Sequence, residues 1–208
     1  SREESETVEI LELGHNGDGL AKLRDGTNRF IPYTLAGEIV KISYTKNDFS
    51  LIKVQRASKD RIEPICKYFT TCGGCKTQQM TLDMYQLWKR GTIEKALINQ
   101  GLNIHVDPLI NAHGQGRRRV SFHAKRNKNQ IFAGLMKYRS HEILNIENCP
   151  ILVPALSSGI KIVRDLARIM PINSKTIDVQ LTMSESGIDC NINNFPAQLS
   201  ELFTVITE

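Results

Sequence analysis

The stretch Cys66-Lys-Tyr-Phe-Thr-Thr-Cys72-Gly-Gly-Cys75 places three cysteines close together, and a fourth follows far downstream in Cys149-Pro150. Four thiolates in a three-plus-one arrangement are typical of a cubane iron–sulfur cluster. Gly73 and Gly74 allow the crowded backbone of a loop that wraps around such a cluster, and they let amide N–H groups approach its sulfurs. We therefore expect the four thiols to meet around one inorganic centre that ties two remote regions together.

Two other uses of these cysteines remain open. Structural zinc sites usually pair two Cys-x-x-Cys knuckles or combine Cys with His, whereas this chain has one knuckle, Cys72 to Cys75. A disulfide framework needs an oxidising compartment, and the sequence has five cysteines and no signal peptide. The pattern favours an iron–sulfur cluster over zinc, and a disulfide framework least. We expect a cytoplasmic protein with no membrane partner, because thiols stay reduced there and no apolar run is long enough to cross a bilayer.

The chain has 208 residues, of which 40% are hydrophobic and 24% are charged, as in ordinary globular proteins. Its net charge of +5 is unevenly distributed. No acidic residue lies between Asp107 and Glu142, and that stretch carries eight Lys and Arg residues. A concentrated basic region indicates a phosphate-rich partner. The alternative is a solvated strand face that binds nothing.

Short apolar alternations broken by glycine run from Val8 to Val54, and Asp25-Gly26 is a hairpin signal. Five short strands at hairpin spacing predict a small barrel over residues 1–60. The first seven residues are rich in Ser and Glu, which indicates a disordered start. Lys53 and Arg56 are candidate nucleic-acid contacts of this barrel.

A helix is expected over residues 82–100, with Thr81 as its N-cap and Gly101 at its end. One side of this helix should face a core, because it carries Tyr85, Trp88, Ile93 and Leu97. A packing role for Trp88 is favoured over base stacking.

The region after Pro108 reads as a second sheet. Its first strand has a polar, basic face and a buried face: Arg119, Ser121, His123 and Lys125 alternate with Val120, Phe122 and Ala124. Further strands are expected over residues 130–136, 142–146, 177–183 and 188–192, the second of which leads to Cys149. Pro154 suits the first turn of a helix whose apolar stripe includes Leu156, Ile160, Val163 and Ala167. The segment 199–206 is compatible with a further helix.

Several motifs, taken in order, resemble the RNA uracil-5-methyltransferase family, and specifically its iron–sulfur branch that acts on 23S ribosomal RNA. They are the Gly17, Gly19, Pro32 and Leu35-Ala-Gly-Glu-Ile-Val40 features of a TRAM barrel, the 66–78 cysteine loop, Arg117-Arg-Arg-Val-Ser-Phe-His123, and Ser140-His-Glu-Ile-Leu-Asn-Ile146 before Cys149-Pro150. The resemblance implies a [4Fe-4S] cluster held by Cys66, Cys72, Cys75 and Cys149.

The family also has a Rossmann-like domain that binds S-adenosylmethionine and supplies a cysteine nucleophile and a carboxylate base. We find no strand, Gly-x-Gly turn and helix of that kind in this sequence. Cys190, between Asp189 and Asn191, lacks the basic neighbour that a reactive thiol needs. The resemblance therefore implies an amino-terminal part of an enzyme, inactive alone, whose catalytic domain lies beyond this chain.

The expected fold is α+β and mostly β. It comprises an OB-like five-stranded TRAM barrel (residues 1–60), an iron–sulfur loop with one helix (61–106) and an antiparallel sheet region with one or two helices (107–208). The expected function is RNA recognition and cluster binding within a methyltransferase. The alternative is a non-enzymatic RNA-binding module that holds iron–sulfur or zinc. The candidate RNA contacts are Lys53, Arg56, Arg117, Arg118, Arg119, His123 and Lys125.

Overall fold

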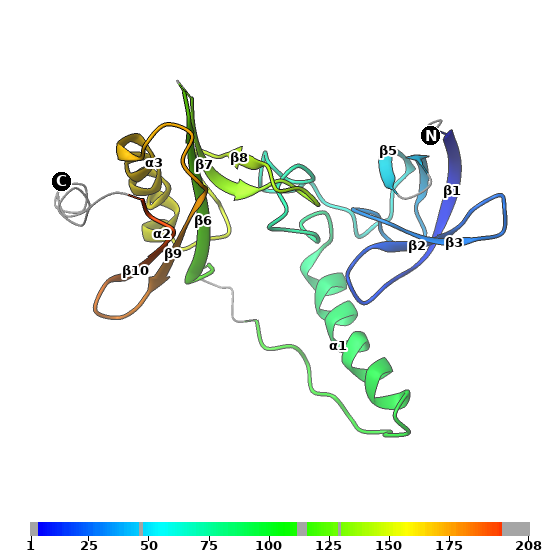
Figure 1. Cartoon of the computed structure of the whole chain (residues 1–208). Coiled ribbons are helices and arrows are strands. Elements are labelled where there is room, and N and C mark those ends of the chain that lie inside the picture. Colours follow the sequence, from blue (N-terminus) through cyan, green and yellow to red (C-terminus); the bar gives the residue numbers. More distant parts are fainter. Residues whose placement is uncertain (1–3, 46–47, 112–115, 129, 197–208) are drawn as a thin grey trace. The chain divides into compact units, whose positions relative to one another are not determined.

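The computed structural model describes residues 4–45, 48–111, 116–128 and 130–196. The chain divides into two compact units (Figure 1). The first unit contains Ser1–Ile65 and Cys75–Ile110, and the second contains Cys66–Gly74 and Asn111–Glu208. The expected helix at 199–206 lies outside the described residues.

The first unit is built on a five-stranded antiparallel sheet with the strand order β3-β2-β1-β4-β5. The strands are β1 (Glu4–Leu13), β2 (Gly19–Lys22), β3 (Asn28–Ile31), β4 (Ile39–Tyr44) and β5 (Phe49–Arg56). The two outer strands, β3 and β5, also contact each other, so the sheet curls toward a barrel as expected. Strand β1 already begins at Glu4, which contradicts the expected disorder for residues 4–7; residues 1–3 lie outside the described residues. Pairing of β1 with β4 orders those residues.

The core of this barrel follows directly from strand alternation. Side chains of one face point inward and are buried: Val8, Ile10, Ala21, Leu23, Ile31, Val40 and Ile42. Their neighbours in sequence, such as Glu9 and Lys41, face outward and are exposed. The hydrophobic pattern therefore fixes the register of each strand, because a slip of one residue would turn the apolar face toward water.

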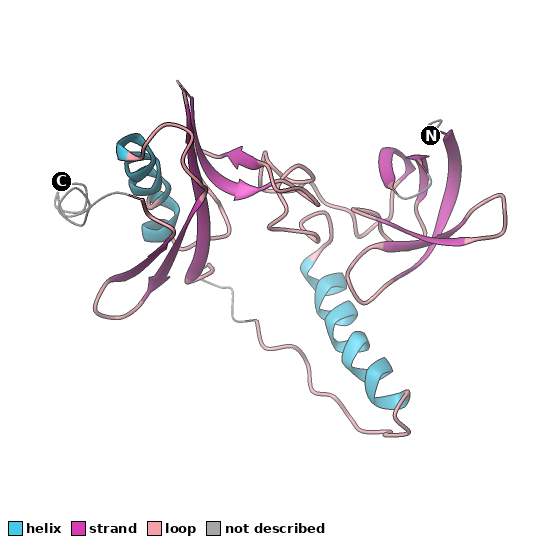
Figure 2. Ribbon diagram, in the orientation of Figure 1, coloured by secondary structure: helices cyan, strands magenta, loops and turns pink. Residues whose placement is uncertain are grey.

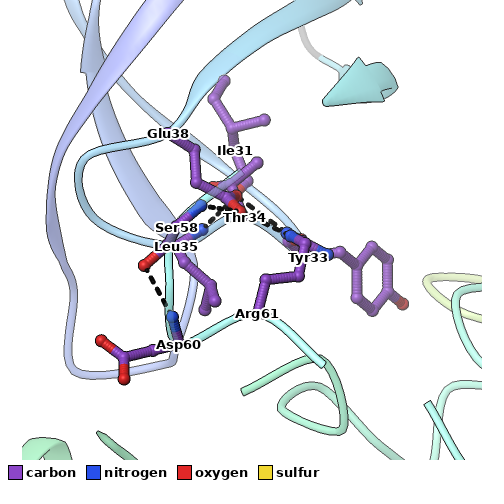
Figure 3. Close-up of polar contacts among 8 residues, drawn as sticks. All are labelled: Ile31, Tyr33, Thr34, Leu35, Glu38, Ser58, Asp60 and Arg61. Carbon is purple, nitrogen blue, oxygen red and sulfur yellow. Dashed lines mark hydrogen bonds and ion pairs between the residues drawn. The ribbon is translucent and has the colours of Figure 1, made fainter. Parts of the chain in front are cut away.

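A buried carboxylate links the β3–β4 connection to the segment that follows β5 (Figure 3). Glu38 is fully buried and accepts hydrogen bonds from the Leu35 amide at 2.8 Å and the Ser58 amide at 3.2 Å. Arg61 donates to it from Nε at 2.5 Å and from Nη2 at 2.8 Å. The charge is thus paired and its oxygens are satisfied, as burial of a carboxylate requires.

Helix α1 (Leu82–Ile98) begins as expected, with the Thr81 hydroxyl accepting from the Met84 amide at 3.4 Å. It ends in a Schellman motif, because the Gly101 amide donates to Ile98 at 2.9 Å and the Leu102 amide donates to Leu97 at 3.0 Å. Gly101 supplies the positive φ of 75° that this ending needs.

The prediction that one side of α1 faces a core is wrong. No residue of the helix is buried, and Ile93 is exposed, while Tyr85, Trp88 and Leu97 are half-buried. Contacts with the barrel turns replace core packing, since Trp88 Nε1 donates to the Gly14 carbonyl at 3.0 Å. The expectation that Trp88 is a packing residue agrees with this contact.

In its described residues, the second unit has a five-stranded antiparallel sheet with the order β10-β9-β6-β7-β8 and two helices (Figure 2). The strands are β6 (Arg119–Asn127), β7 (Gln130–Met136), β8 (Ile143–Asn145), β9 (Ile177–Met183) and β10 (Ile188–Asn193). The helices are α2 (Pro154–Ser158), which starts at Pro154 as expected, and α3 (Ile160–Ile169). Both units together confirm the α+β, mostly β fold class.

One face of the second sheet packs on α2 and α3. The buried face of β6, including Phe122 and Ala124, shares one core cluster with Leu156 and Val163 of the helices. The predicted helical stripe is therefore confirmed, with a break at Gly159 between α2 and α3. Gly134 of β7 is sterically required, because a Cβ there would lie 1.9 Å from the Leu144 carbonyl oxygen.

None of the helices in the described ranges has the length and apolar character that a membrane crossing needs.

Candidate cysteine centre and nucleic-acid interface

The part of the cysteine loop that belongs to the second unit lies along the end of β7. Cys72 forms an isolated antiparallel bridge with Lys137. The Gly73 amide donates to the Met136 carbonyl at 2.9 Å, and the Tyr138 amide donates to the Thr71 carbonyl at 2.9 Å. A Cβ at position 73 would lie 3.2 Å from the Met136 oxygen, so the glycine allows this close approach.

A second set of contacts ties the same loop to the segment just before Cys149. The Glu147 amide donates to the Tyr68 hydroxyl at 3.1 Å, and Lys67 Nζ donates to Glu147 Oε2 at 2.5 Å. This hydrogen bond raises the pKa of Lys67 and lowers the pKa of Glu147. The structure therefore brings Lys67 and Tyr68 into contact with Glu147, two residues before the fourth cysteine.

Cys149 itself is buried in the core cluster of the second unit. Its amide donates to Ser157 Oγ at 3.1 Å, and Tyr68, between Cys66 and Cys72, packs against the same cluster. Tyr68 of the loop and Cys149 thus belong to one core.

The environment of the thiols fits thiolate ligands in part. Cys72 and Cys149 are buried and Cys66 is half-buried, while Cys75 is half-buried and belongs to the first unit. The Gly74 amide donates to Cys72 Sγ at 3.4 Å, the kind of N–H···S contact that stabilises a thiolate. Within the described ranges, no three Cys, His, Asp or Glu side chains are grouped tightly enough to hold a metal ion. The four-cysteine ligand set therefore stays a prediction.

The second sheet presents a basic face opposite its helices. The outward side chains of β6 are exposed or half-buried: Arg119, Ser121, His123 and Lys125. Arg117 and Arg118, just before the strand, are also exposed. Arg118 Nη2 donates to the Met183 carbonyl at 3.3 Å, and the Arg117 backbone bridges to Leu152, so both arginines begin from an ordered backbone.

An acidic partner on this face was missed at the sequence level. Asp178 Oδ1 of β9 lies 2.6 Å from His123 Nδ1, because His123 and Asp178 are paired across β6 and β9. The two residues are 55 positions apart, so no local pattern could reveal the contact. The pair orients the imidazole within an otherwise basic face.

The other two predicted RNA contacts lie in the first unit, on β5. Lys53 and Arg56 are both exposed. Arg56 Nη2 lies 3.8 Å from Glu9 Oε1 of β1, a solvent-exposed ion pair that partly neutralises the guanidinium. Of the two side chains, Lys53 is therefore the better candidate for a phosphate contact.

Cys190 behaves as the sequence indicated. Cys190 lies on β10 between Asp189 and Asn191 and is exposed as a residue, although its thiol is partly desolvated. This desolvation, together with the Asp189 carboxylate, raises the pKa of Cys190. A raised pKa keeps the thiol protonated, which does not suit a nucleophile.

Comparisons with known proteins agree with this picture. Residues 4–47 match the TRAM domain family. A Brucella suis biovar 1 protein named an uncharacterized RNA methyltransferase is 34% identical over 182 residues, covering 88% of this chain and 44% of that protein. A Halomonas elongata protein named 23S rRNA (uracil(1939)-C(5))-methyltransferase RlmD is 31% identical over 164 residues, covering 75% of this chain and 34% of that protein.

The chain thus spans half or less of the length of the curated relatives it matches. A Francisella tularensis subsp. novicida protein with the same RlmD name is 29% identical over 191 residues, covering 86% of this chain and 42% of that protein. The barrel of the first unit is therefore a TRAM domain, and the chain as a whole is related to proteins named RNA methyltransferases.

Proposed function

We propose that this chain is the RNA-recognition and cluster-bearing part of an S-adenosylmethionine-dependent RNA uracil-5-methyltransferase, with 23S ribosomal RNA as its substrate. The observation that carries the proposal is the open basic face of β6 in a chain related to RNA methyltransferases. The cysteine nucleophile, the carboxylate base and the cofactor site belong to a carboxy-terminal domain outside these residues.

RNA binding follows from the charge and shape of the two units. Arg117, Arg118 and Arg119 can neutralise phosphates at one end of β6, and Lys125 can do so further along the strand. Specific recognition then requires unpaired bases, because the major groove of A-form RNA is too deep and narrow to be read. Methylation at C5 of uracil in turn requires the target base to leave its stack and reach the catalytic domain.

Cys66, Cys72, Cys75 and Cys149 are the residues that would hold a [4Fe-4S] cluster. The support is the loop packing at Met136 and Glu147, the burial of two thiols and the amide contact to Cys72 Sγ. Bound there, the cluster would supply four iron–thiolate bonds that hold the cysteine loop and Cys149 together. We further propose three functional regions: the barrel (1–60), the cysteine loop with its helix (61–106) and the second sheet region (107–208). The proposed location of the protein is the cytoplasm.

The direct test uses the complete protein that contains this chain. Purified with S-adenosylmethionine carrying a labelled methyl group, it should transfer label to C5 of one uridine in unmodified 23S ribosomal RNA. RNA binding without methyl transfer would contradict the proposed methyltransferase activity and would favour a non-enzymatic RNA-binding module.

The interface is tested on this chain by replacing Arg117, Arg118 and Arg119 with alanine. The slope of log affinity against log salt should become shallower by about 0.7 for each arginine that contacts a phosphate of a single strand. The matched control replaces Lys161, Arg168 and Lys175, which removes the same charge from α3 and the turn after it. If both variants show the same slope of log affinity against log salt, the three arginines lie on a solvated face and do not contact RNA.

A further inference from the structure

Phe30 on β3 of the TRAM barrel has 51% of its surface exposed. Ile31, the next residue, is fully buried, so strand alternation turns Phe30 away from the barrel core. A single exposed apolar residue is ordinary on a protein surface. What distinguishes Phe30 is the rigid structure beneath its ring.

That structure is the turn from Gly14 to Asp18. Phe30 Cε1 would lie 2.6 Å from a Cβ at position 14, so the ring rests directly on the glycine backbone. The turn is closed by two hydrogen bonds, from the Gly14 amide to the Asp18 carbonyl at 2.9 Å and from the Gly17 amide to the Gly14 carbonyl at 3.0 Å. Gly14 is therefore fixed in place and cannot accept a side chain without displacing Phe30.

Helix α1 holds the same turn from another side. Trp88 Nε1 donates to the Gly14 carbonyl at 3.0 Å, and the edge of the indole would lie 3.4 Å from a Cβ at Gly17. Phe30 and Trp88 thus both contact Gly14. We call these three residues the Phe30 platform.

The charges around the Phe30 platform favour an anionic ligand. Glu12 and Asp18, on either side of the turn, each pair with a lysine: Glu12 with Lys95 at 3.1 Å and Asp18 with Lys76 at 3.9 Å. A third lysine contacts the Trp88 ring of the platform, with Lys89 Nζ 4.7 Å from the ring centroid. These three lysines and two carboxylates together carry a formal charge of +1.

An exposed aromatic ring beside lysines is the arrangement by which proteins bind single-stranded nucleic acid, because every base can stack on such a ring while the lysines attract its phosphates. We propose that the Phe30 platform stacks one unpaired base of a bound RNA, with the Lys89 side supplying the phosphate contact. This inference rests on the proposed RNA function, and it assigns the first unit its own role in base recognition, separate from the basic face of β6.

The test measures binding of this chain to a labelled single-stranded RNA of about 12 nucleotides. Phe30→Leu keeps an apolar side chain but removes the aromatic face, and it should weaken binding about 5- to 150-fold, the range that loss of one stacked base implies. Phe30→Trp should retain binding. The matched control is Ile52→Ala on β5. Ile52 is 52% exposed, and this substitution should leave RNA binding unchanged.

Trp88 offers a second readout because it is the only tryptophan of the chain. RNA that stacks on Phe30 should change Trp88 fluorescence in the wild type and the Ile52→Ala variant, and not in Phe30→Leu. Circular dichroism of each variant establishes that the barrel is folded.

Two results would overturn the Phe30 platform while leaving the proposed function intact. One is undiminished binding by Phe30→Leu in conditions where the Arg117, Arg118 and Arg119 variant binds more weakly. The other is equal affinity of the wild type for single-stranded RNA and for a duplex of the same length, because a duplex offers no free base to stack. Absence of any RNA binding by the wild type would instead overturn both proposals.

Discussion

Glu38 shows how one residue can organise a connection that has no regular structure. Its carboxylate accepts from the amides of Leu35 and Ser58 and from the Arg61 guanidinium, which itself donates to the Tyr33 carbonyl at 2.8 Å (Figure 3). Residues far apart in the sequence are thereby held around one buried charge. The arrangement anchors the segment that follows β5.

We expect Glu38→Ala to destabilise the first unit by about 3–5 kcal/mol, because it leaves the Arg61 charge and two amides without their acceptor. Urea unfolding followed by circular dichroism measures the change. The control is Glu9→Ala, which removes the exposed pair with Arg56 and should cost at most about 1 kcal/mol. Similar losses for the two variants would mean that the buried network contributes little.

At the scale of elements, α1 stands out because it is ordered without burying any residue. Its ends are fixed by the Thr81 cap and the Gly101 Schellman motif, and its side chains reach the barrel through Trp88 and through Lys95, which pairs with Glu12. Local helix propensity should therefore matter more here than in a core helix.

Gly91 provides the test of that statement, since a Cβ at this position of α1 would meet nothing within 4 Å. Gly91→Ala should stabilise the first unit by about 0.8–1 kcal/mol, as alanine replaces glycine inside a helix. Gly101→Ala should instead destabilise it, because φ there is +75° and alanine is strained in that region. Thermal unfolding of both variants measures the difference, and equal shifts would contradict the local origin of α1 stability.

At the scale of the whole molecule, the cysteine loop is shared between two units. Cys66 and Cys72 belong to the unit that contains Cys149, whereas Cys75 belongs to the unit that contains α1. The proposed ligand set therefore draws on residues of both units.

We expect Cys72→Ser to lose iron after anaerobic reconstitution with iron and sulfide, because serine cannot replace the buried thiolate. Iron and sulfide analysis, together with the thiolate-to-iron absorbance band, measures the loss. Cys190→Ser is the control and should bind iron like the wild type, since Cys190 is remote from the proposed ligand set in sequence and is not a member of it. Retained iron in Cys72→Ser would refute this ligand, and zinc in place of iron would favour the zinc alternative.

Much of the fold could be predicted from local patterns. The alternation of Arg119 to Lys125 defined both faces of β6, and Thr81, Gly101 and Pro154 marked helix ends that the structure confirms. These features depend on residues only a few positions apart, which is why a single sequence contains them. The core side of α1 was predicted wrongly, because helical spacing of apolar residues does not reveal whether another element covers them.

The sequence by itself determined which side chains of each strand face a core, and it singled out four cysteines and a basic stretch as the chemistry to explain. Only the tertiary structure decided that Asp178 meets His123, that Glu38 meets Arg61, and that Phe30 and Trp88 converge on Gly14. The physical reason is that periodicity is a property of neighbouring residues, whereas these contacts depend on which strands pair and where a helix docks.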